Sequence, residues 1–313
     1  SANLLGNYPS QVTDTGAVTI APVPNTGTLA VQYIATAAGT YKLTVVVDGV
    51  STPITGTDVL VNAGPINAAQ STADGTGWFS AVAGAEATFF VTGRDVYGNT
   101  RNQDDSPTSK LQVLRGAGSV NEVVNVPSAV FTFDAATQLY TAKYTANVAG
   151  TLEMNVYFGG VDIAASPRVI VIAAGPSDAL KSVLSGSGTA GTLVGRVGSM
   201  TLQAYDAFGN LKKTGGDAFR VTLVPAGSSD PSIADNGDGT YTIVYSPSVA
   251  GDATLAVKLF NAYVQQGCNF DTVPTSGCQI TVKGADQMGA QVIAIDKTTY
   301  GSYAVPLSTR VVG

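Results

Sequence analysis

Few residues of this chain are of types that could carry out catalysis or bind a metal, and their scarcity excludes several classes of function. The sequence contains no histidine, so it lacks the commonest general base and the commonest transition-metal ligand, and with them Ser-His-Asp and Cys-His catalysis. Its only two cysteines, Cys268 and Cys278, are too few for a thiolate metal cage. We therefore expect no cofactor, no metal site and no enzyme activity from these residues.

The two cysteines suggest a structural role instead. The segment between them includes Gly and Pro, which permit a loop closed by a disulfide. For a loop of this size the bond would stabilise the fold by about 2–3 kcal/mol. Such a bond implies an oxidising compartment. The alternative is two free thiols in a reducing one. We predict the disulfide.

A cluster of acidic and amide residues could suggest calcium. Its members are Asp235, Asn236, Gly237, Asp238 and Gly239. A calcium loop needs six or more oxygen ligands, usually with a bidentate acid further on, whereas this segment runs directly into a strand. We interpret it as a hairpin turn capped by its own side chains. Asp104 and Asp105 are expected in a solvated loop, and Trp78 in the core rather than on a sugar-binding surface.

Composition sets the broad class. Charged residues make up only 12% of the chain, 44% is apolar, and the net charge is −6. Lysines and arginines are scattered singly, which argues against nucleic acid as a partner. No apolar run is long enough to span a membrane, so this segment is expected to have no membrane span. The low charge fits an extracellular or cell-surface protein.

Three marks recur along the chain in the same order. Spacings of 111 residues separate the first two copies of each mark, and 101 residues separate the second and third copies of the last. The marks are Gly64-Pro65 and Gly175-Pro176, the turns Asp95–Asn99 (with Gly98 and Asn99) and Asp206–Asn210 (with Gly209 and Asn210), and Ala38-Gly39, Ala149-Gly150 and Ala250-Gly251. This regularity predicts tandem repeats.

Within each repeat the pattern is that of strands and turns. Apolar residues alternate with period two before and after each Ala-Gly mark, as in Tyr140–Tyr144 and Leu152–Phe158, and this alternation is typical of half-buried strands. Gly, Asn and Asp between the strands supply tight turns. Strands about ten residues apart, repeated over about a hundred residues, predict an all-β fold of antiparallel sandwiches.

The repeats resemble the filamin repeat, an immunoglobulin-like sandwich. The resemblance lies in 235–247 followed by Ala250-Gly251, in Ser166-Pro167 running into Gly175-Pro176, and in the Asp-x-aromatic-Gly-Asn turns. Bacterial invasin-type repeats share some of these elements, but the Ser-Pro strand favours filamin. The resemblance implies that partner peptides could add beside strands C and D, at Leu111, Val113, Phe219, Val221 and Leu223. No actin-binding module is present.

Aligning the marks gives four segments. They are a partial repeat with strands C to G (1–64), two complete repeats (65–175 and 176–284, the latter with the cysteine loop), and strands A and B of a further repeat (285–313). The simpler interpretation is a window from a longer array. The sharper hypothesis is that the A–B segment of one chain completes the C–G fragment of the next, building a filament.

These observations predict a structural or adhesive segment of a long extracellular protein, a stiff spacer in a surface fibre with contacts at its strand edges. Its partners would be neighbouring repeats, other copies of itself, or a protein or glycan at the surface. The alternative is a peptide- or glycan-binding module of an adhesion receptor.

Overall fold

The chain is built almost entirely of β-strands. The structure, a computed structural model, describes residues 2–6, 18–47, 50–53, 58–113, 128–224, 229–267 and 277–284. Over these residues it holds strands and three short 3-10 helices, none of them long and apolar enough to cross a membrane. It divides into two compact units, Ser1–Lys181 with Ala204–Gly215, and Ser182–Gln203 with Gly216–Gly313. The predicted all-β, tandem immunoglobulin-like sandwich fold is confirmed.

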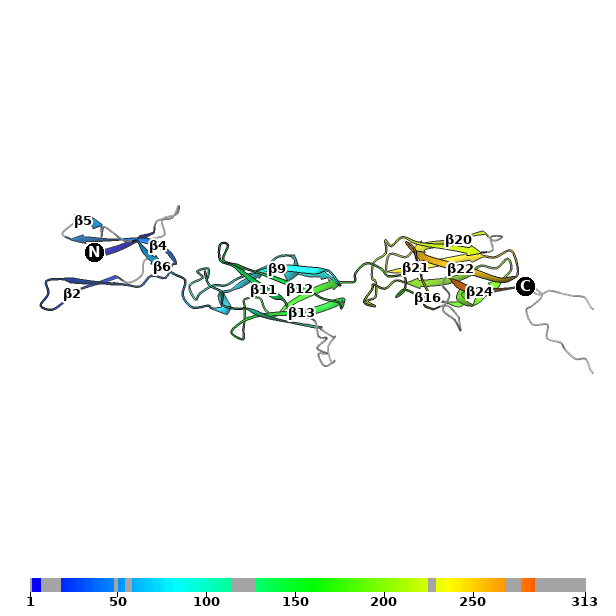
Figure 1. Cartoon of the computed structure of the whole chain (residues 1–313), viewed down its shortest axis with the longest axis horizontal. Helices are drawn as coiled ribbons and strands as arrows, with labels where there is room; N and C mark the ends of the chain where they lie inside the picture. The colour runs from blue at the N-terminus through cyan, green and yellow to red at the C-terminus, as the bar shows by residue number, and fades with distance from the viewer. Residues whose placement is uncertain are drawn as a thin grey trace, which may run out of the picture. The chain divides into compact units, whose positions relative to one another are not determined.

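The second repeat is a sandwich of two sheets (Figure 1). One sheet has the order β11-β12-β9-β7 and the other β10-β13-β15-β8, with β14 beside β13. All neighbours are antiparallel except β15 and β8. The elements are η1 (Ala68–Gln70), β7 (Thr72–Asp74), η2 (Thr76–Trp78), β8 (Ser80–Val82), β9 (Glu86–Thr92), β10 (Thr108–Val113), β11 (Val130–Asp134), β12 (Leu139–Thr145), β13 (Gly150–Phe158), β14 (Val161–Asp162) and β15 (Arg168–Ala173).

The third repeat has the same topology strand for strand. Its sheets have the orders β16-β18-β21-β20 and β17-β24-β22-β19, with β23 beside β22. The elements are β16 (Val183–Ser185), η3 (Ser187–Ala190), β17 (Gly191–Leu193), β18 (Gly198–Gln203), β19 (Phe219–Val224), β20 (Ser229–Asp235), β21 (Thr240–Ser246), β22 (Gly251–Leu259), β23 (Ala262–Tyr263) and β24 (Cys278–Lys283).

The first repeat shows the counterparts of β10 to β15. Strand β4 pairs with β1, β5 and β6, and β2 pairs with β3. Leu29 of β3 is 57% exposed, whereas its counterpart Tyr140 in the second repeat is buried beneath the opposite sheet. The elements are β1 (Ala2–Gly6), β2 (Val18–Pro22), β3 (Leu29–Tyr33), β4 (Gly39–Val47), β5 (Val50–Pro53) and β6 (Val59–Val61). Residues 285–313 lie outside the described residues, so the predicted segment boundaries and the complementation hypothesis remain predictions.

The core of the second repeat follows from the alternation in its strands. In β9 and β12 every second residue is buried, because successive side chains point to opposite faces of a sheet. Phe89 lies at the centre, with the rings of Trp78, Phe131 and Tyr144 at 5.4, 6.1 and 6.1 Å. Trp78 is thus a core residue, as expected, and its ring is unavailable as a sugar platform.

A buried tyrosine ties each complete sandwich to the 3-10 turn that precedes its second strand. The Tyr144 hydroxyl donates to Gly77 O at 2.7 Å, and Tyr245 donates to Gly188 O at 2.6 Å. Only glycine fits at these positions: a Cβ at Gly77 would lie 2.6 Å from Thr88 O, and one at Gly188 would lie 2.5 Å from Ser199 O. Burial raises the pKa of Tyr144 to about 12, so this hydroxyl stays a donor at all ordinary pH.

Removing this hydroxyl tests the packing. We expect Tyr144→Phe to lower the free energy of unfolding by about 1 kcal/mol, because the buried Gly77 carbonyl loses its donor. Urea unfolding monitored by Trp78 fluorescence measures the change. Tyr97→Phe, at a tyrosine that is 62% exposed, is the matched control and should leave stability unchanged; equal effects of the two variants would contradict the assignment.

Candidate functional site

The turn after β9 is organised around the carboxylate of Asp95. Its Oδ1 accepts the backbone N–H groups of Tyr97 and Asn99, both at 2.9 Å, and its Oδ2 accepts the Asn99 side-chain amide at 2.8 Å. The backbone closes the turn with bonds from Asp95 N to Asn99 O and from Gly98 N to Asp95 O, both at 3.0 Å. Each of the three residues has its own task in the turn. Asp95 supplies the acceptor, Gly98 adopts a positive φ of 87°, and Asn99 supplies a second polar side chain.

The turn after β18 repeats this arrangement atom for atom. Asp206 Oδ1 accepts from Phe208 N at 3.0 Å and Asn210 N at 2.8 Å, and Oδ2 accepts from Asn210 Nδ2 at 2.8 Å. We call Asp95–Asn99 and Asp206–Asn210 the first and second Asp–Asn turns. Both lie in the first compact unit, which includes Ala204–Gly215.

Each turn also contacts the repeat that precedes it in the chain. Asn99 Oδ1 accepts from Ala38 N and its Nδ2 donates to Thr36 O, both at 2.8 Å. In the second turn, Asn210 Oδ1 accepts from Ala149 N and Nδ2 donates to Asn147 O, both at 2.9 Å. The contacted segments, just before β4 and β13, hold the Ala-Gly marks of the sequence. The asparagine thus bridges its own aspartate and the backbone of the preceding repeat.

The Gly-Pro linker enters the same network. Asp95 Oδ2 accepts from Gly64 N at 2.8 Å, and Asp206 Oδ2 accepts from Gly175 N at 2.8 Å. A cation holds the linker carbonyl: Arg101 Nη1 donates to Gly64 O, and Lys212 Nζ donates to Gly175 O at 3.1 Å. One carboxylate therefore joins the linker and the turn.

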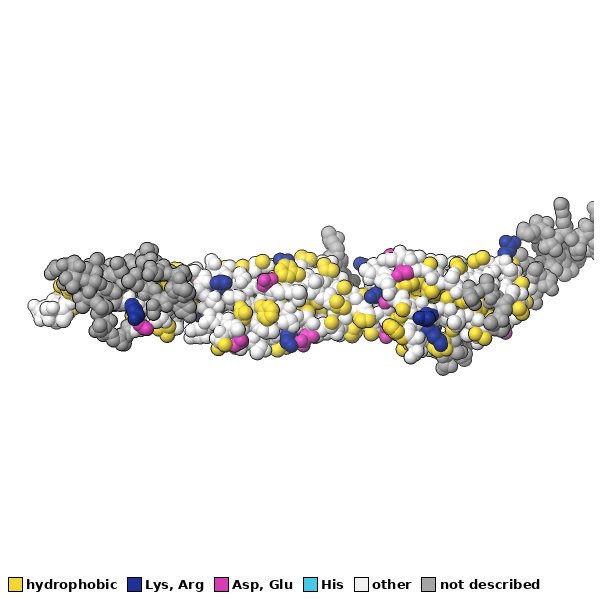
Figure 2. All heavy atoms as spheres, turned by 90° about the horizontal axis from the view of Figure 1, so that it is seen from above, with side chains coloured by type: hydrophobic (Ala, Val, Ile, Leu, Met, Phe, Trp, Pro, Cys, Tyr) yellow, Lys and Arg dark blue, Asp and Glu magenta, His cyan; other side chains and the backbone are white. Residues whose placement is uncertain are grey.

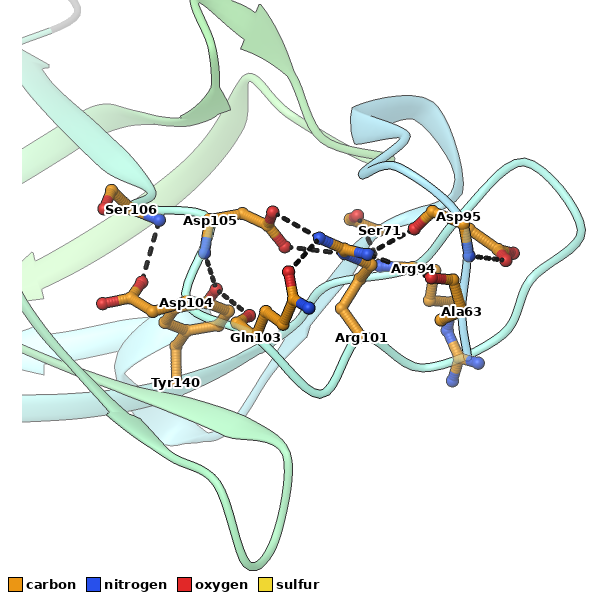
Figure 3. Close-up of polar contacts among 11 residues, drawn as sticks. Ala63, Ser71, Arg94, Asp95, Arg101, Gln103, Asp104, Asp105, Ser106 and Tyr140 are labelled. Atoms are coloured by element: carbon orange, nitrogen blue, oxygen red, sulfur yellow. Dashed lines mark hydrogen bonds and ion pairs between the residues drawn. The ribbon is translucent and has the colours of Figure 1, made fainter. Parts of the chain in front are cut away.

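Arg101 is itself fixed by a bidentate ion pair (Figure 3). Its Nε and Nη2 donate to the two carboxylate oxygens of Asp105 at 2.9 and 2.8 Å, and Asp105 N donates to the Tyr140 hydroxyl at 2.6 Å. The Arg101 side chain is only 9% exposed and that of Asp105 14%. The expectation that Asp104 and Asp105 share a solvated loop was thus wrong for Asp105, because Arg101 needs a carboxylate where it reaches back to the linker. Asp104 is exposed.

The two turn carboxylates are buried, yet they favour the charged form. Burial by itself raises the pKa of Asp95, but hydrogen bonds from the Asn99 side chain and from the N–H groups of Gly64, Asn99 and Tyr97 outweigh it, so that the pKa lies below its usual value. The pKa of Asp206 is lowered in the same way against the effect of burial, by its bonds from Asn210, Gly175 and Phe208. An ionised carboxylate is acceptor-only, which matches a site made of donors.

The aromatic residue of the second turn adds an apolar contact. The Phe208 ring lies over Gly84, between β8 and β9, where a Cβ would come within 2.3 Å of the ring. Gly84 has φ +80°, so this position suits glycine both for its backbone and for the ring above it.

The other predicted site residues lie apart from the Asp–Asn turns. Asp235–Gly239 forms a turn between β20 and β21, in which Asp235 Oδ1 accepts from Gly237 N and Asp238 Oδ1 accepts from Thr240 N, at 2.8 and 2.9 Å. These carboxylate oxygens accept backbone N–H groups of the turn itself, as expected for a hairpin turn capped by its own side chains. Among the described residues there is no group of three or more Cys, Asp or Glu side chains that could hold a metal ion.

The predicted edge residues lie on strands at the ends of their sheets. β10 carries Leu111 and Val113, and β19 carries Phe219, Val221 and Leu223. Among the described strands, β10 pairs only with β13 and β19 only with β22. Leu111, Phe219 and Leu223 are buried and face the core, so an added strand would meet their backbone and the alternate, outward side chains. Peptide addition here stays a prediction.

Of the two cysteines, Cys278 begins β24 and is buried, whereas Cys268 lies outside the described residues. The disulfide remains a prediction.

Sequence analysis identified the Asp–Asn turns as marks of the repeat but did not predict which residues they contact. The available signal was that the Gly-Pro, Asp–Asn and Ala-Gly marks recur together with one spacing of 111 residues. A common spacing shows only that the three marks belong to one repeating unit, and their contact was seen only in the folded chain.

Comparison with known proteins agrees with this geometry. The family model of the Filamin/ABP280 repeat matches residues 65–169 and 176–270, more than half of the sequence. The chain belongs to the filamin repeat family. Both matched stretches contain one Asp–Asn turn.

Curated relatives match over less than a third of the chain. Tripartite motif-containing protein 2 of Homo sapiens is 35% identical over 89 residues, 28% of this chain and 12% of that protein. E3 ubiquitin-protein ligase TRIM71 of Mus musculus is 32% identical over 95 residues, 30% of this chain and 11% of that protein. The match thus spans only about a tenth of the length of these relatives.

A solved structure is similar over more of the chain. The Escherichia coli adhesin FdeC aligns with a TM-score of 0.54 and 20% identity, covering 85% of this chain and 82% of that one. At this identity the likeness concerns the fold.

The buried carboxylates predict a pH-dependent stability. Because the pKa of Asp206 is lower in the folded chain than in the unfolded one, ionised Asp206 stabilises the fold above its unfolded pKa of about 3.9, and this contribution is lost as the pH falls through the folded pKa. We expect Asp206→Asn to cost about 3 kcal/mol at pH 7, because several buried N–H groups lose a charged acceptor, and less at low pH.

Urea unfolding of both proteins between pH 7 and 2.5 measures this difference. Asp58→Asn, at an exposed aspartate of the first repeat, is the control and should follow the wild type throughout. A constant difference between Asp206→Asn and the wild type over the whole pH range would contradict the role given to the carboxylate.

Proposed function

We propose that this chain is a structural repeat segment of a surface protein, in which the Asp–Asn turns couple consecutive filamin repeats. The observation that carries the proposal is that the same six side-chain hydrogen bonds occur at both joints, three within the turn, one to the linker and two to the preceding repeat. Sequences between the joints differ, while these partner atoms stay the same.

The chemistry of the joint suits a load-bearing role. To separate the turn from the linker, the Gly64 or Gly175 N–H must leave a buried carboxylate, and hydrogen bonds to charged groups contribute about 1.5–3 kcal/mol each. The Arg101 or Lys212 cation would have to release a linker carbonyl in the same step. Several modest bonds that break together favour a joint that resists extension over one that swings freely.

A location outside the cell is part of the proposal. It is supported by the low charge content of 12%, the predicted Cys268–Cys278 disulfide and the fold shared with a bacterial adhesin. On the face drawn in Figure 2, Lys, Arg, Asp and Glu side chains are scattered among neutral ones, and such a surface suits contacts with proteins or glycans rather than with polyanions.

The role is proposed as non-catalytic. The chain has no histidine. Asp95 and Asp206, two buried carboxylates whose pKa is lowered, are surrounded by N–H donors of their own turns and linkers. A second candidate is recognition of a peptide, favoured by the single-sided pairing of β10 and β19 at the sheet ends. An added strand would pair with these edges through backbone hydrogen bonds.

The coupling is tested by two reciprocal substitutions. Asn210→Ala should speed hydrogen exchange of the Ala149 amide by about tenfold or more, because that N–H loses its acceptor, while the Ala38 amide stays protected. Asn99→Ala should do the reverse. Amide exchange by NMR in the full chain measures both, and each variant is the control for the other. Unchanged exchange at Ala149 and Ala38 in both variants would contradict the coupling.

The proposed location is tested through the cysteine loop. Purified without reductant, the chain should have a mass about 2 Da below that of the reduced chain, because disulfide formation removes two hydrogen atoms. Intact-mass spectrometry measures this, and a Cys268→Ser, Cys278→Ser chain provides the control that shows no shift on reduction. Equal masses before and after reduction would speak against an oxidising compartment.

A further inference from the structure

The segment between β21 and β22 in the third repeat has the form of the two segments that receive Asp–Asn turns. In all three repeats a tyrosine stands five residues before the alanine of the Ala-Gly mark. Gly251 has φ +129°, close to the +136° of Gly150. The carbonyl of Pro247 accepts from Gly195 N, as the carbonyl of Ala146 accepts from Gly84 N, both at 2.8 Å. We call Ser248–Gly251 the third acceptor turn.

The third acceptor turn is uncovered. Where the second Asp–Asn turn lies on the second repeat, Val148, Ala149 and Gly150 are half-buried, whereas their counterparts Val249, Ala250 and Gly251 are exposed, Val249 to 58%. Within the described part of the chain, the N–H of Ala250 and the carbonyl of Ser248 have no hydrogen-bond partner. These are the two groups that Asn210 binds in the second repeat, as Ala149 N and Asn147 O.

We infer that Ser248–Gly251 is a docking site for the Asp-x-aromatic-Gly-Asn turn of a further filamin-type repeat joined in tandem. The inference rests on the proposed function, because it extends the same contact to a third position. The incoming asparagine would accept from Ala250 N with its Oδ1 and donate to Ser248 O with its Nδ2.

The recognition chemistry explains why this occupant is favoured. Both established contacts are made to backbone groups, so Thr36, Asn147 and Ser248 can differ in side chain and still offer the same carbonyl. The required donor and acceptor lie on one asparagine amide, held in place by the aspartate four residues earlier. Asn99 and Asn210 already bind the two preceding segments, so the proposed occupant of the third acceptor turn is the turn of another repeat.

The test adds such a repeat. A chain ending at Gly284 is continued with a second copy of residues 175–284, so that a Gly-Pro linker follows the last strand at the same distance as in the second joint. We expect exchange of the Ala250 amide, measured by NMR, to slow by about tenfold or more relative to the original chain. The same extended chain with the copied Asn210 replaced by alanine is the matched control and should exchange at Ala250 as the original chain does.

Exchange at the Ala149 and Ala250 amides distinguishes failure of this inference from failure of the proposed function. If Ala149 responds to Asn210→Ala while Ala250 exchanges equally in all chains, the third docking site is overturned and the proposed function stands. If Ala149 itself does not respond, the proposed function fails. If Ala250 of the unextended chain becomes protected as concentration rises, a second copy is the occupant, and the tandem assignment is overturned.

Discussion

The arrangement of this protein's joints depends on one buried carboxylate per joint. Asp95 and Asp206 each sit among N–H donors from their own turn and from the Gly-Pro linker. Because a buried anion is tolerated only when donors surround it, the carboxylate fixes the turn and the linker against each other. The asparagine that it orients can then reach the preceding repeat. The hydrogen bonds that stabilise the aspartate charge within the turn therefore also position the asparagine that contacts the preceding repeat.

The sandwich supplies the surroundings that make this possible. Aromatic packing around Phe89 and the Tyr144 hydroxyl bond fix the sheet of β9 and β12 against the 3-10 turn η2, and the rings of Tyr140 and Phe158 pack between the two sheets. The Asp–Asn turn follows β9 and is therefore held at one end of this sandwich. The second joint has the same bonds although a lysine replaces the arginine and a phenylalanine the tyrosine. The geometry therefore depends on the Asp, Gly and Asn of the turn, whereas the residues around it vary.

The fold was predictable from the sequence because its signals are local. Period-two alternation marks β12 and β13, and glycines and asparagines mark the turns between strands. The contacts of the joint were not predictable in the same way, since Asn99 and Ala38 are far apart in the chain and the bond uses a backbone N–H that carries no sequence signature. Asp105 shows a similar limit: its ion pair with Arg101 depends on how one loop folds back toward the linker. The common spacing of the marks identified the repeats in the sequence, but it did not indicate which marks meet.

Contacts through the Asp–Asn turns can recur from one repeat to the next in a filamin-type array. The second repeat carries an Asp–Asn turn that contacts its predecessor and an Ala-Gly segment that receives the turn of its successor, so that the same contact can be added one joint at a time. In the proposed structural role, such an array would resist extension at its joints while its strand edges and loops stayed available for partners. This division of tasks is compatible with a structural role and with an adhesive one.

The central claim is the bond between the Asn210 side chain and the Ala149 amide, and NMR can detect it directly. A scalar coupling across the hydrogen bond should appear between the Ala149 amide nitrogen and the Asn210 side-chain carbonyl carbon, and another between Ala38 and Asn99. Couplings of the same kind across the β9–β12 pair serve as the internal reference. If the reference couplings are seen and those of Ala149 and Ala38 are absent, the account of the joint is wrong.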